Sequence, residues 1–343
     1  MKTILIKEHG DVNVLNSVLT SEPDCPVDRI KINIKACSIN HLDIWVRNGI
    51  PGIRIPLPLI MGSDASGTIV EIGKNLLSSG YSLGDDVVIQ PGTFNTSLID
   101  SKNKKENYSS SYGILGETEN GVQSEYVLLK PENIYPKPKH LSFEEAASMP
   151  LVFMTSYQML IERAEIKKDD FVLIYGGTSG IGMAAIQIAK DIGATVITTV
   201  GSDEKKSFVQ KLNPDYILNH EEDDLYKKIK HISPKGVDVV FEHIGPSTWN
   251  QSVRVLAIGG KIVTCGATTG NKVSIDLRYL FMKQQSILGS TMGSLSTFKN
   301  VFDKINNMKY NPYIDRVYKF DDIKKAHMRM ENRKHFGKII IVP

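Results

Sequence analysis

Residues 171–194 read FVLIYGGTSGIGMAAIQIAKDIGA, and this stretch decides the fold of the second half of the chain. The apolar run at its start predicts a short buried strand, the glycines predict a tight turn, and the pattern that follows predicts an amphipathic helix. In such a unit the glycines let the backbone approach a pyrophosphate, and the helix amides and dipole hold its charge. We therefore expect a dinucleotide site at Gly177, Thr178, Ser179, Gly180 and Ile181.

The residues after this unit alternate between β-branched runs and helical segments. The strand-like runs are TVITTV (195–200), YILN (216–219), VDVVF (237–241) and KIVTC (261–265). This alternation predicts βαβ units, which form a parallel sheet with right-handed crossovers. Ligands of such sheets bind at the carboxyl ends of the strands. Gly266, Ala267 and Ser290 follow later strands, so we expect them to line the same site.

The first 150 residues have a different pattern. Strand-like runs at 29–36, 67–73 and 85–92 are separated by Gly, Pro and Asp, which predicts a mainly β domain. The final run FGKIIIVP (336–343) is a further strand that can return to this domain. We expect a mainly β domain of residues 1–151 and 292–343, and a doubly wound domain of residues 152–291.

The composition is that of a globular protein, with 41% hydrophobic and 23% charged residues in 343. The net charge of +3 comes without a basic cluster, so nucleic acid is not expected as a partner. No apolar stretch approaches the roughly 18 residues that a membrane helix needs, and no secretory apolar region follows the amino terminus. Three widely spaced cysteines form no CxxC pair. We expect a cytoplasmic protein that does not enter the membrane.

The choice of cofactor depends on the end of the second predicted strand. NAD-preferring sites place an acid there for the ribose hydroxyls, whereas this strand ends at Val200. Ser202 can donate a hydrogen bond to a 2′-phosphate, and Lys205 can supply positive charge, as can Lys206. Either lysine can equally belong to a solvated helix face. His220 can stack on the adenine or reach the phosphate, or be an ordinary surface histidine. We predict NADPH rather than NADH.

A longer match lies in ACSINHLDIWVRNGIPGIRIPLPLIMGSDASGTIVEIG (36–73), and further matches lie at 112–129, 146–160, 285–294 and 335–342. With the glycine turn, and in this order, these stretches resemble the medium-chain dehydrogenases/reductases over nearly the whole chain. That family joins a GroES-like β domain to a Rossmann domain. The resemblance therefore implies an α/β fold with a GroES-like mainly β domain and a Rossmann doubly wound parallel-sheet domain.

The resemblance also implies that both zinc sites of the family are missing. Zinc-dependent relatives would carry ligands at Asn40, Ser63 and Leu151, none of which is a usual zinc ligand here. Asp64 and His41 remain nearby, but two such groups make a poor tetrahedral site. The structural zinc lobe would map onto Asn95, Leu98, Ser101 and Ser109, within the polar, loop-like segment 95–111. The hydroxyl that relays the alcohol proton in zinc enzymes falls at Leu42. No zinc is expected.

The stretch around Asn40 resembles the zinc-less quinone oxidoreductase branch, which uses NADPH to reduce quinones or activated carbon–carbon double bonds. Hydrogen bonds are enough to stabilise the developing enolate or quinol oxygen of such substrates. The resemblance therefore implies hydride transfer to a quinone or an α,β-unsaturated carbonyl. Two alternatives stay open: an alcohol dehydrogenase or aldehyde reductase of the same superfamily, and a non-catalytic NADPH-binding protein. By analogy with relatives that pair through an edge strand, here near 283–290, we expect a homodimer or homotetramer.

The remaining candidate residues come from the same resemblance. Asn40 is expected to hydrogen bond the substrate carbonyl, or else to cap a loop. Asp43 is expected to orient Asn40 or His41, or to have a structural role only. His41 is expected near the cofactor pyrophosphate, Thr155 at the nicotinamide, and Lys338 at the cofactor phosphates unless it is a solvated terminal lysine.

Overall fold

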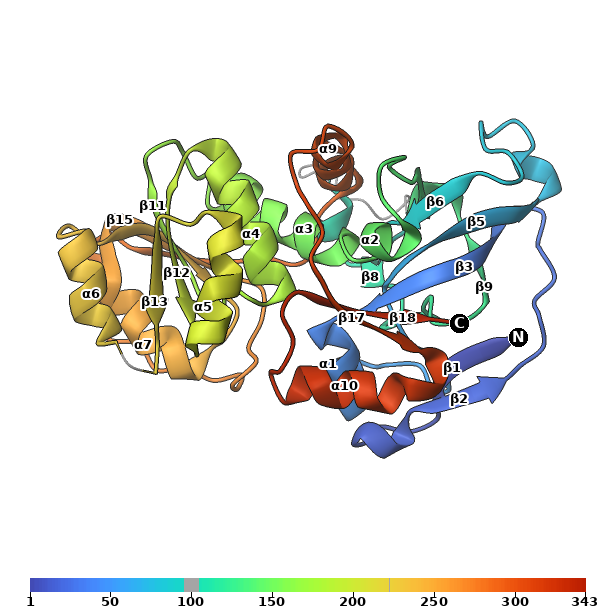
Figure 1. The fold of residues 1–343 in the computed structure, drawn as a ribbon, viewed down its shortest axis with the longest axis horizontal. Coiled ribbons are helices and arrows are strands. Elements are labelled where there is room, and N and C mark those ends of the chain that lie inside the picture. The colour runs from blue at the N-terminus through green and yellow to red at the C-terminus, as the bar shows by residue number, and fades with distance from the viewer. Residues whose placement is uncertain (96–104, 222) are drawn as a thin grey trace. The chain divides into compact units, whose positions relative to one another are not determined.

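The computed structural model describes residues 1–95, 105–221 and 223–343 (Figure 1). It divides the chain into two compact units. Unit 1 comprises Met1–Leu151 and Ser294–Pro343, and unit 2 comprises Val152–Gly293. Two positions of the expected metal-free lobe, Leu98 and Ser101, lie outside the described residues. In the described parts of the chain, no helix has both the length and the apolar character needed to cross a membrane.

Unit 2 is built on one six-stranded sheet in the order β13-β12-β11-β14-β15-β16, with every pair parallel. The strands are β11 (Phe171–Ile174), β12 (Thr195–Val200), β13 (Tyr216–Asn219), β14 (Val237–Glu242), β15 (Leu256–Thr264) and β16 (Ser286–Gly289). The chain begins at β11 in the centre, winds outward to β13, and then returns to β14 on the other side of β11. The predicted doubly wound sheet is confirmed, and its switch point lies between β11 and β14.

Helices cover both faces of this sheet. They are α4 (Gly180–Ile192), α5 (Asp203–Val209), α6 (Leu225–Ile232), α7 (Pro246–Val255) and α8 (Leu277–Met282), while α3 (Pro150–Tyr157) leads into unit 2. Figure 1 shows α4 and α5 on one side of the strands and α6 and α7 on the other. Strands covered on both faces need continuous apolar runs, which is why FVLIY and VDVVF lack a polar alternation.

Unit 1 contains a seven-stranded sheet in the order β10-β6-β5-β3-β18-β17, with β9 also paired to β3. Its strands are β3 (Ile30–Ile39), β5 (Asp64–Ile72), β6 (Asp86–Ile89), β9 (Tyr126–Leu129), β10 (Ile134–Pro136), β17 (Ile314–Lys319) and β18 (Lys338–Val342). The smaller sheets join β1 (Lys2–Ile6), β2 (Asn16–Leu19) and β4 (Leu59–Ile60), and pair β7 (Gly92–Thr93) with β8 (Gly113–Ile114). The helices are α1 (His41–Asn48), α2 (Phe143–Ala147), α9 (Leu295–Asn306) and α10 (Ile323–Glu331).

The carboxyl-terminal strand belongs to unit 1. β18 pairs antiparallel with β3, with Ile339 opposite Ile39 and Ile340 opposite Ser38. Continued by one residue, this register brings Lys338 opposite Asn40, which follows the end of β3. Residues almost 300 positions apart in the sequence therefore meet at one end of the sheet.

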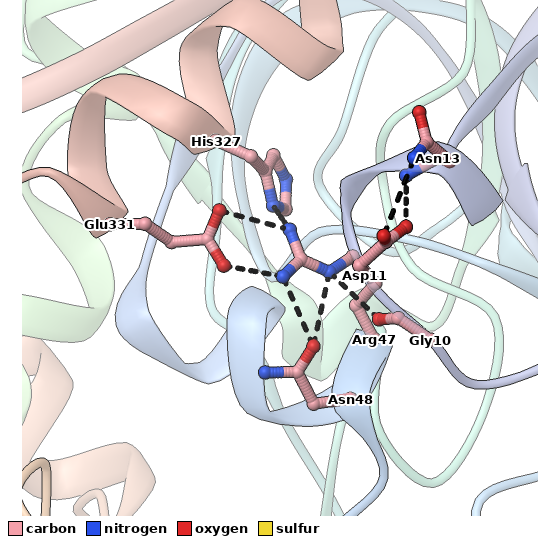
Figure 2. Close-up of polar contacts among 7 residues, drawn as sticks. All are labelled: Gly10, Asp11, Asn13, Arg47, Asn48, His327 and Glu331. Carbon is pink, nitrogen blue, oxygen red and sulfur yellow. Dashed lines mark hydrogen bonds and ion pairs between the residues drawn. The ribbon is translucent and has the colours of Figure 1, made fainter.

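Helix α1, which begins directly after Asn40, is fixed at its other end by a buried arginine (Figure 2). Arg47 is 1% exposed, and its Nη2 contacts Glu331 Oε1 of α10 at 2.5 Å. The guanidinium also donates to the carbonyl oxygen of Gly10 at 3.2 Å, and its Nη1 lies 3.4 Å from His327 Nδ1. A charge buried this deeply is stable only when it is paired and hydrogen bonded. Arg47 thus holds α1 against α10 and the amino-terminal segment.

Candidate active site and cofactor site

A cluster of buried polar side chains lies in unit 1, where β3 ends and β5 and β18 begin. Asn40 is 4% exposed, Asp64 0% and Lys338 3%. The amide of Asn40 bridges the two charges: its Nδ2 donates to Asp64 Oδ2 at 2.8 Å, and its Oδ1 accepts from the Lys338 ammonium. Lys338 Nζ also lies 3.3 Å from Asp64 Oδ2. The register of β18 on β3 brings these three groups together.

The Asp64 carboxylate accepts two further hydrogen bonds. Ser38 Oγ donates to Oδ2 at 3.1 Å, and the backbone N–H of Leu151 donates to Oδ1 at 2.9 Å. Together with Asn40 and Lys338, these donors bring four polar contacts to the carboxylate, three at Oδ2 and one at Oδ1. Asp64 therefore links β3, β18 and the start of α3 through one group.

Asp43 contacts the backbone of Asn40 rather than its side chain. Its Oδ2 accepts from the Asn40 backbone N–H at 2.7 Å, which caps the first turn of α1. Burial raises the pKa of Asp43 to about 7, against the lowering effect of hydrogen bonds from the Asn40 and Gly62 amides and of the nearby Lys338 charge. Burial also lowers the pKa of Lys338, against the attraction of Asp64 and Asp43. For both side chains, burial favours the neutral form, and the opposite charges around them favour the charged form.

Two other predicted residues of unit 1 lie close to this cluster in the sequence. His41 is the first residue of α1, is partly exposed, and packs edge-on against Trp45 at 5.4 Å between ring centroids. Lys338 is not a solvated terminal lysine, so that alternative is wrong: its neighbours on β3 enclose it. The contact of Lys338 with the cofactor phosphates stays a prediction. Its ammonium donates to Asn40 Oδ1 and Asp64 Oδ2.

The cluster does not fit a zinc ion. Asn40, Ser63 and Leu151 offer no thiolate, imidazole or carboxylate. Asp64 already accepts from four donors, and the Asp43 carboxylate caps the start of α1. Over residues 1–95, 105–221 and 223–343, no group of three or more His, Cys, Asp or Glu side chains is placed to hold a metal.

In unit 2 the glycine turn follows β11 and starts α4. Ser179 caps the helix, with its Oγ accepting from the Gly182 N–H at 3.0 Å. Side chains are excluded at two positions: a Cβ on Gly177 would lie 2.4 Å from Thr198 Oγ1, and a Cβ on Gly182 would lie 2.3 Å from the Gly176 carbonyl oxygen. The first N–H groups of α4 lack intrahelical acceptors and favour an anion. This bare backbone fits a pyrophosphate.

The loops after β11, β14 and β15 meet at the switch point. His243, which follows β14, places its Nε2 2.9 Å from the Tyr175 carbonyl oxygen, and Thr268 Oγ1 donates to the His243 carbonyl oxygen at 2.9 Å. The predicted residues Gly266 and Ala267 lie in the same loop after β15. Sequence reasoning missed His243, although its place directly after VDVVFE was the available signal.

Ser290 and Thr155 complete the predicted residues near this edge of unit 2. Ser290 follows β16 and donates its backbone N–H to Thr264 at 2.9 Å. Its Oγ is buried and has no hydrogen-bond partner within the described part of the chain. Buried hydroxyls in proteins nearly always have a hydrogen-bond partner, and a ligand bound at this edge of the sheet would supply one. Thr155 of α3 is 4% exposed, and its Oγ1 lies 3.7 Å from Met292 Sδ.

The residues predicted for the adenosine end gather around Gly201. Ser202 caps α5, with its Oγ accepting from the Lys205 N–H at 3.3 Å. A Cβ on Gly201 would lie 3.1 Å from His220 Nε2, so the His220 ring lies against this turn. His220 Nε2 is also 3.5 Å from Glu221 Oε1, a carboxylate that weakens the positive charge available here. The structure thus brings Ser202, Lys205 and His220 into one neighbourhood.

A doubly wound sheet with a glycine turn at its switch point, joined in one chain to a mainly β unit with a polar cluster, defines a two-domain oxidoreductase that uses a nicotinamide cofactor. Residues 27–139 match the family described as the alcohol dehydrogenase GroES-like domain, and residues 180–307 match the zinc-binding dehydrogenase family. The chain belongs to the medium-chain dehydrogenase/reductase superfamily, and the predicted family, fold class and oxidoreductase activity are confirmed.

Two curated relatives illustrate the range of the family. The chain is 30% identical to a crotonyl-CoA reductase of Streptomyces avermitilis over 97% of its own length and 79% of the relative. It is 27% identical to the quinone oxidoreductase of Homo sapiens over 100% and 98% of the two chains. The two names refer to different substrates, although each match covers at least 97% of this chain.

Two solved structures share the fold over nearly the whole chain. A crystal structure described as an NAD-dependent alcohol dehydrogenase has a TM-score of 0.94 and 34% identity, with 100% of both chains covered. The 2-octenoyl-CoA carboxylase reductase CinF, in complex with NADP and 2-octenoyl-CoA, has a TM-score of 0.90 and 26% identity, with 99% of this chain and 87% of that chain covered.

Proposed function

We propose that the protein transfers a hydride from NADPH to a quinone or an α,β-unsaturated carbonyl compound without zinc. The observation that carries the proposal is the side chain of Asn40. At the position of a metal ligand it presents a neutral amide that is held between Lys338 and Asp64. A fixed N–H donor can stabilise the oxyanion that develops on a conjugated carbonyl, but it is a weaker electrophile than a metal ion. Substrates that are already electron-poor suit such a site.

The division of labour between the units follows from their residues. The bound cofactor supplies the hydride, and unit 2 binds it through the bare glycine backbone and the first amides of α4. In unit 1, Asn40 donates a hydrogen bond to the substrate oxygen, and Asp43 fixes the Asn40 backbone through the start of α1. The names of relatives agree with this substrate class, because they refer to a quinone, to crotonyl-CoA and to 2-octenoyl-CoA.

NADPH is proposed over NADH on the character of the second strand end. Val200 is 1% exposed and uncharged, and Ser202 and Lys205 lie close by. The CinF structure contains NADP, which supports the proposal, whereas the alcohol dehydrogenase structure is described as NAD-dependent. A titration of the purified protein with each cofactor decides between them. Equal dissociation constants would contradict the NADPH preference.

The test of the substrate class is NADPH oxidation with a panel of quinones, enones and enoyl thioesters, compared with simple aldehydes and alcohols. We expect turnover with the conjugated substrates and no loss of activity after chelation. Asn40→Leu should lower kcat about 10²–10³-fold, the usual loss for one oxyanion donor. Activity that is lost with a chelator and restored by zinc would contradict the proposal.

Alcohol oxidation is the second candidate, because the structure with 34% identity is described as an alcohol dehydrogenase. It predicts steady reduction of NADP or NAD by simple alcohols in the same panel. Under this alternative Asn40→Leu would affect both directions of an aldehyde–alcohol pair equally, since the same oxygen is contacted in each direction.

We also propose that two copies of the chain pair through the edge of the unit 2 sheet. β16 is the last strand of that sheet, and Ile287 on it is 40% exposed. Ile258, Phe281 and Met282, also in unit 2, are 68–74% exposed. An open strand edge with exposed apolar residues is suited to pairing with a second copy. Light scattering on the intact protein tests this, and Ile287→Lys should shift a dimer towards monomer.

A further inference from the structure

We infer that Lys338 and Asp64 are positioning residues that hold the Asn40 amide in a single orientation and leave one of its N–H bonds for the substrate oxygen. The inference rests on the proposed function only in naming the substrate as the acceptor. The orientation itself follows from three contacts within unit 1. They are the Lys338 ammonium on Asn40 Oδ1, Asn40 Nδ2 on Asp64 Oδ2 at 2.8 Å, and Lys338 Nζ on the same oxygen at 3.3 Å.

The two charges make the reversed amide unfavourable. Turned by 180° about its last bond, Asn40 would place its NH₂ group against the Lys338 ammonium, two donors facing each other. It would also place its carbonyl oxygen against the Asp64 carboxylate, two acceptors facing each other. Both contacts change from attractive to repulsive in a site that excludes water, where electrostatic interactions are strong. The charges of Lys338 and Asp64 therefore decide the orientation of the amide.

In this orientation the hydrogen-bonding capacity of Asn40 is almost used up. The amide oxygen accepts from Lys338, and one Nδ2 hydrogen is donated to Asp64. The second Nδ2 hydrogen has no partner among the described residues. The positive charge at the oxygen and the negative charge at the nitrogen both favour the charge-separated form of the amide. The same two charges oppose rotation about the Cβ–Cγ bond, which keeps the remaining donor in place.

A purely structural origin explains the cluster less well. The rest of β18 is apolar: Ile339, Ile340 and Ile341 are each 0% exposed. Burying an ammonium and a carboxylate costs several kcal/mol of desolvation for each ion, and apolar residues of similar size often stabilise a core equally well. The charged pair at the start of this strand is better explained by the amide that it orients.

The test compares Lys338→Met, Lys338→Arg and the double variant Lys338→Met/Asp64→Asn, all in the full-length protein. The double variant removes both charges at nearly constant volume, so it folds even where the single change leaves Asp64 unpaired. We expect kcat for the conjugated substrate to fall roughly 10–100-fold in Lys338→Met and in the double variant, a loss typical of a misplaced catalytic group. KM for NADPH should stay unchanged, and Lys338→Arg should recover part of kcat.

Lys31→Met is the matched control. Lys31 of β3 is, like Lys338 of β18, a buried lysine: it is 7% exposed and paired with Glu22 at 2.5 Å. It precedes Asn40 by nine residues, about 30 Å of extended chain. We expect it to lose stability while keeping kcat. A raised KM for NADPH with normal kcat in Lys338→Met would overturn the inference and assign Lys338 to the cofactor phosphates. A normal kcat and a normal KM in both Lys338 variants would overturn it as well.

A measurement without substrate separates this inference from the proposed function. In protein labelled with ¹⁵N-asparagine, the side-chain signal of Asn40 is identified by its loss in Asn40→Leu. In the wild type we expect two distinct side-chain amide protons that exchange slowly with water. In the double variant we expect both protons to exchange with water faster. Slow exchange in a wild type that reduces no quinone or enone would refute the proposed function alone. Equal exchange in both proteins would refute the positioning role even if the enzyme is active.

Discussion

The two units prepare their ligand sites in opposite ways. Unit 2 uses the absence of side chains: Gly177 and Gly182 lie where a Cβ would collide with the Thr198 side chain and the Gly176 carbonyl oxygen, and the helix start supplies N–H groups. Unit 1 uses buried charges, with Asp64, Lys338 and Arg47 all at most 3% exposed and all paired. A backbone site depends on local conformation, whereas a site of buried charges depends on partners from distant strands and helices. The two kinds of site should therefore respond differently to substitution.

The largest effect is expected where unit 1 depends most on pairing. Arg47→Met leaves Glu331 with no cation from α1 and leaves the Gly10 carbonyl oxygen without this donor. Glu331 is 34% exposed and can be solvated without Arg47, so we expect the free energy of unfolding to fall by about 1.5–3 kcal/mol, the usual contribution of hydrogen bonds to a charged group. Urea denaturation measures it. The control is Arg278→Met, which breaks an exposed pair with Asp276 and should leave stability unchanged. Equal losses in both variants would contradict the comparison.

The matching change in unit 2 adds a side chain instead of removing one. Gly182→Ala places a Cβ 2.3 Å from the Gly176 carbonyl oxygen, so the turn must shift. Overpacking of this kind costs about 1–3 kcal/mol, and we expect NADPH affinity to fall roughly 5–150-fold. Calorimetric titration measures it. Gly289→Ala is the control, because a Cβ there meets nothing within 4 Å. An unchanged dissociation constant in Gly182→Ala would mean that the turn does not bind the cofactor.

Two buried groups of unit 1 should give pH dependences of opposite sign. Burial raises the pKa of Asp43 from 3.8 to about 7, so the folded state holds an extra proton between these values and loses stability as pH rises through 7. Burial and Arg47 lower the pKa of His327 from 6.5 to about 3, so stability is lost as pH falls from 6.5 towards 3. Each proton contributes a slope of at most about 1.4 kcal/mol per pH unit.

The variants Asp43→Asn and His327→Leu separate the two contributions. In the wild type the two slopes oppose each other between pH 3.8 and pH 6.5 and largely cancel. In measurements between about pH 4 and pH 8, Asp43→Asn should show the His327 contribution alone, an unfolding free energy that rises with pH up to 6.5. His327→Leu should show the Asp43 contribution alone, an unfolding free energy that falls with pH up to about 7. Parallel curves for the wild type and both variants would show that neither group titrates differently on folding.

The smallest effect is expected at the adenosine end of unit 2, where Lys205 is partly exposed and Lys206 is exposed. Lys205→Ala should weaken NADPH binding by roughly 0.2–1 kcal/mol, up to about fivefold, and leave NADH binding unchanged. Lys206→Ala, one residue along the same helix, is the comparison. A larger effect of Lys206→Ala would mean that Lys206, and not Lys205, contacts the 2′-phosphate. If neither substitution weakens NADPH binding, the NADPH preference must come from Ser202 and His220.

Much of unit 2 was predictable because its signals are local. FVLIY followed by GGTSGIG and an amphipathic segment specifies a strand, a turn and a helix within 24 residues, and the structure contains β11, the turn and α4 there. His243 was missed because the residue after a strand has no motif of its own. Its contact with Tyr175 depends on two strands that are adjacent in the sheet but far apart in the chain.

In unit 1 the sequence indicated the positions but not their arrangement. Asn40 was predicted as a substrate contact, Asp64 was considered only as a leftover metal ligand, and Lys338 was assigned to the phosphates. No periodicity connects residues 24 and 298 positions away from Asn40. They meet because β5 and β18 both pair with β3 in a defined register, and a shift of one residue would turn each side chain to the other face.

The sequence by itself determined the family, the two-domain α/β fold, the dinucleotide turn and the lack of ordinary zinc ligands at the expected positions, because each depends on residue types at short spacing. Only the tertiary structure decided that Lys338 and Asp64 enclose the Asn40 amide, and that Arg47 anchors the helix beginning after it. The physical reason is that a buried charge needs a partner at hydrogen-bonding distance, and strand pairing and helix packing alone select that partner.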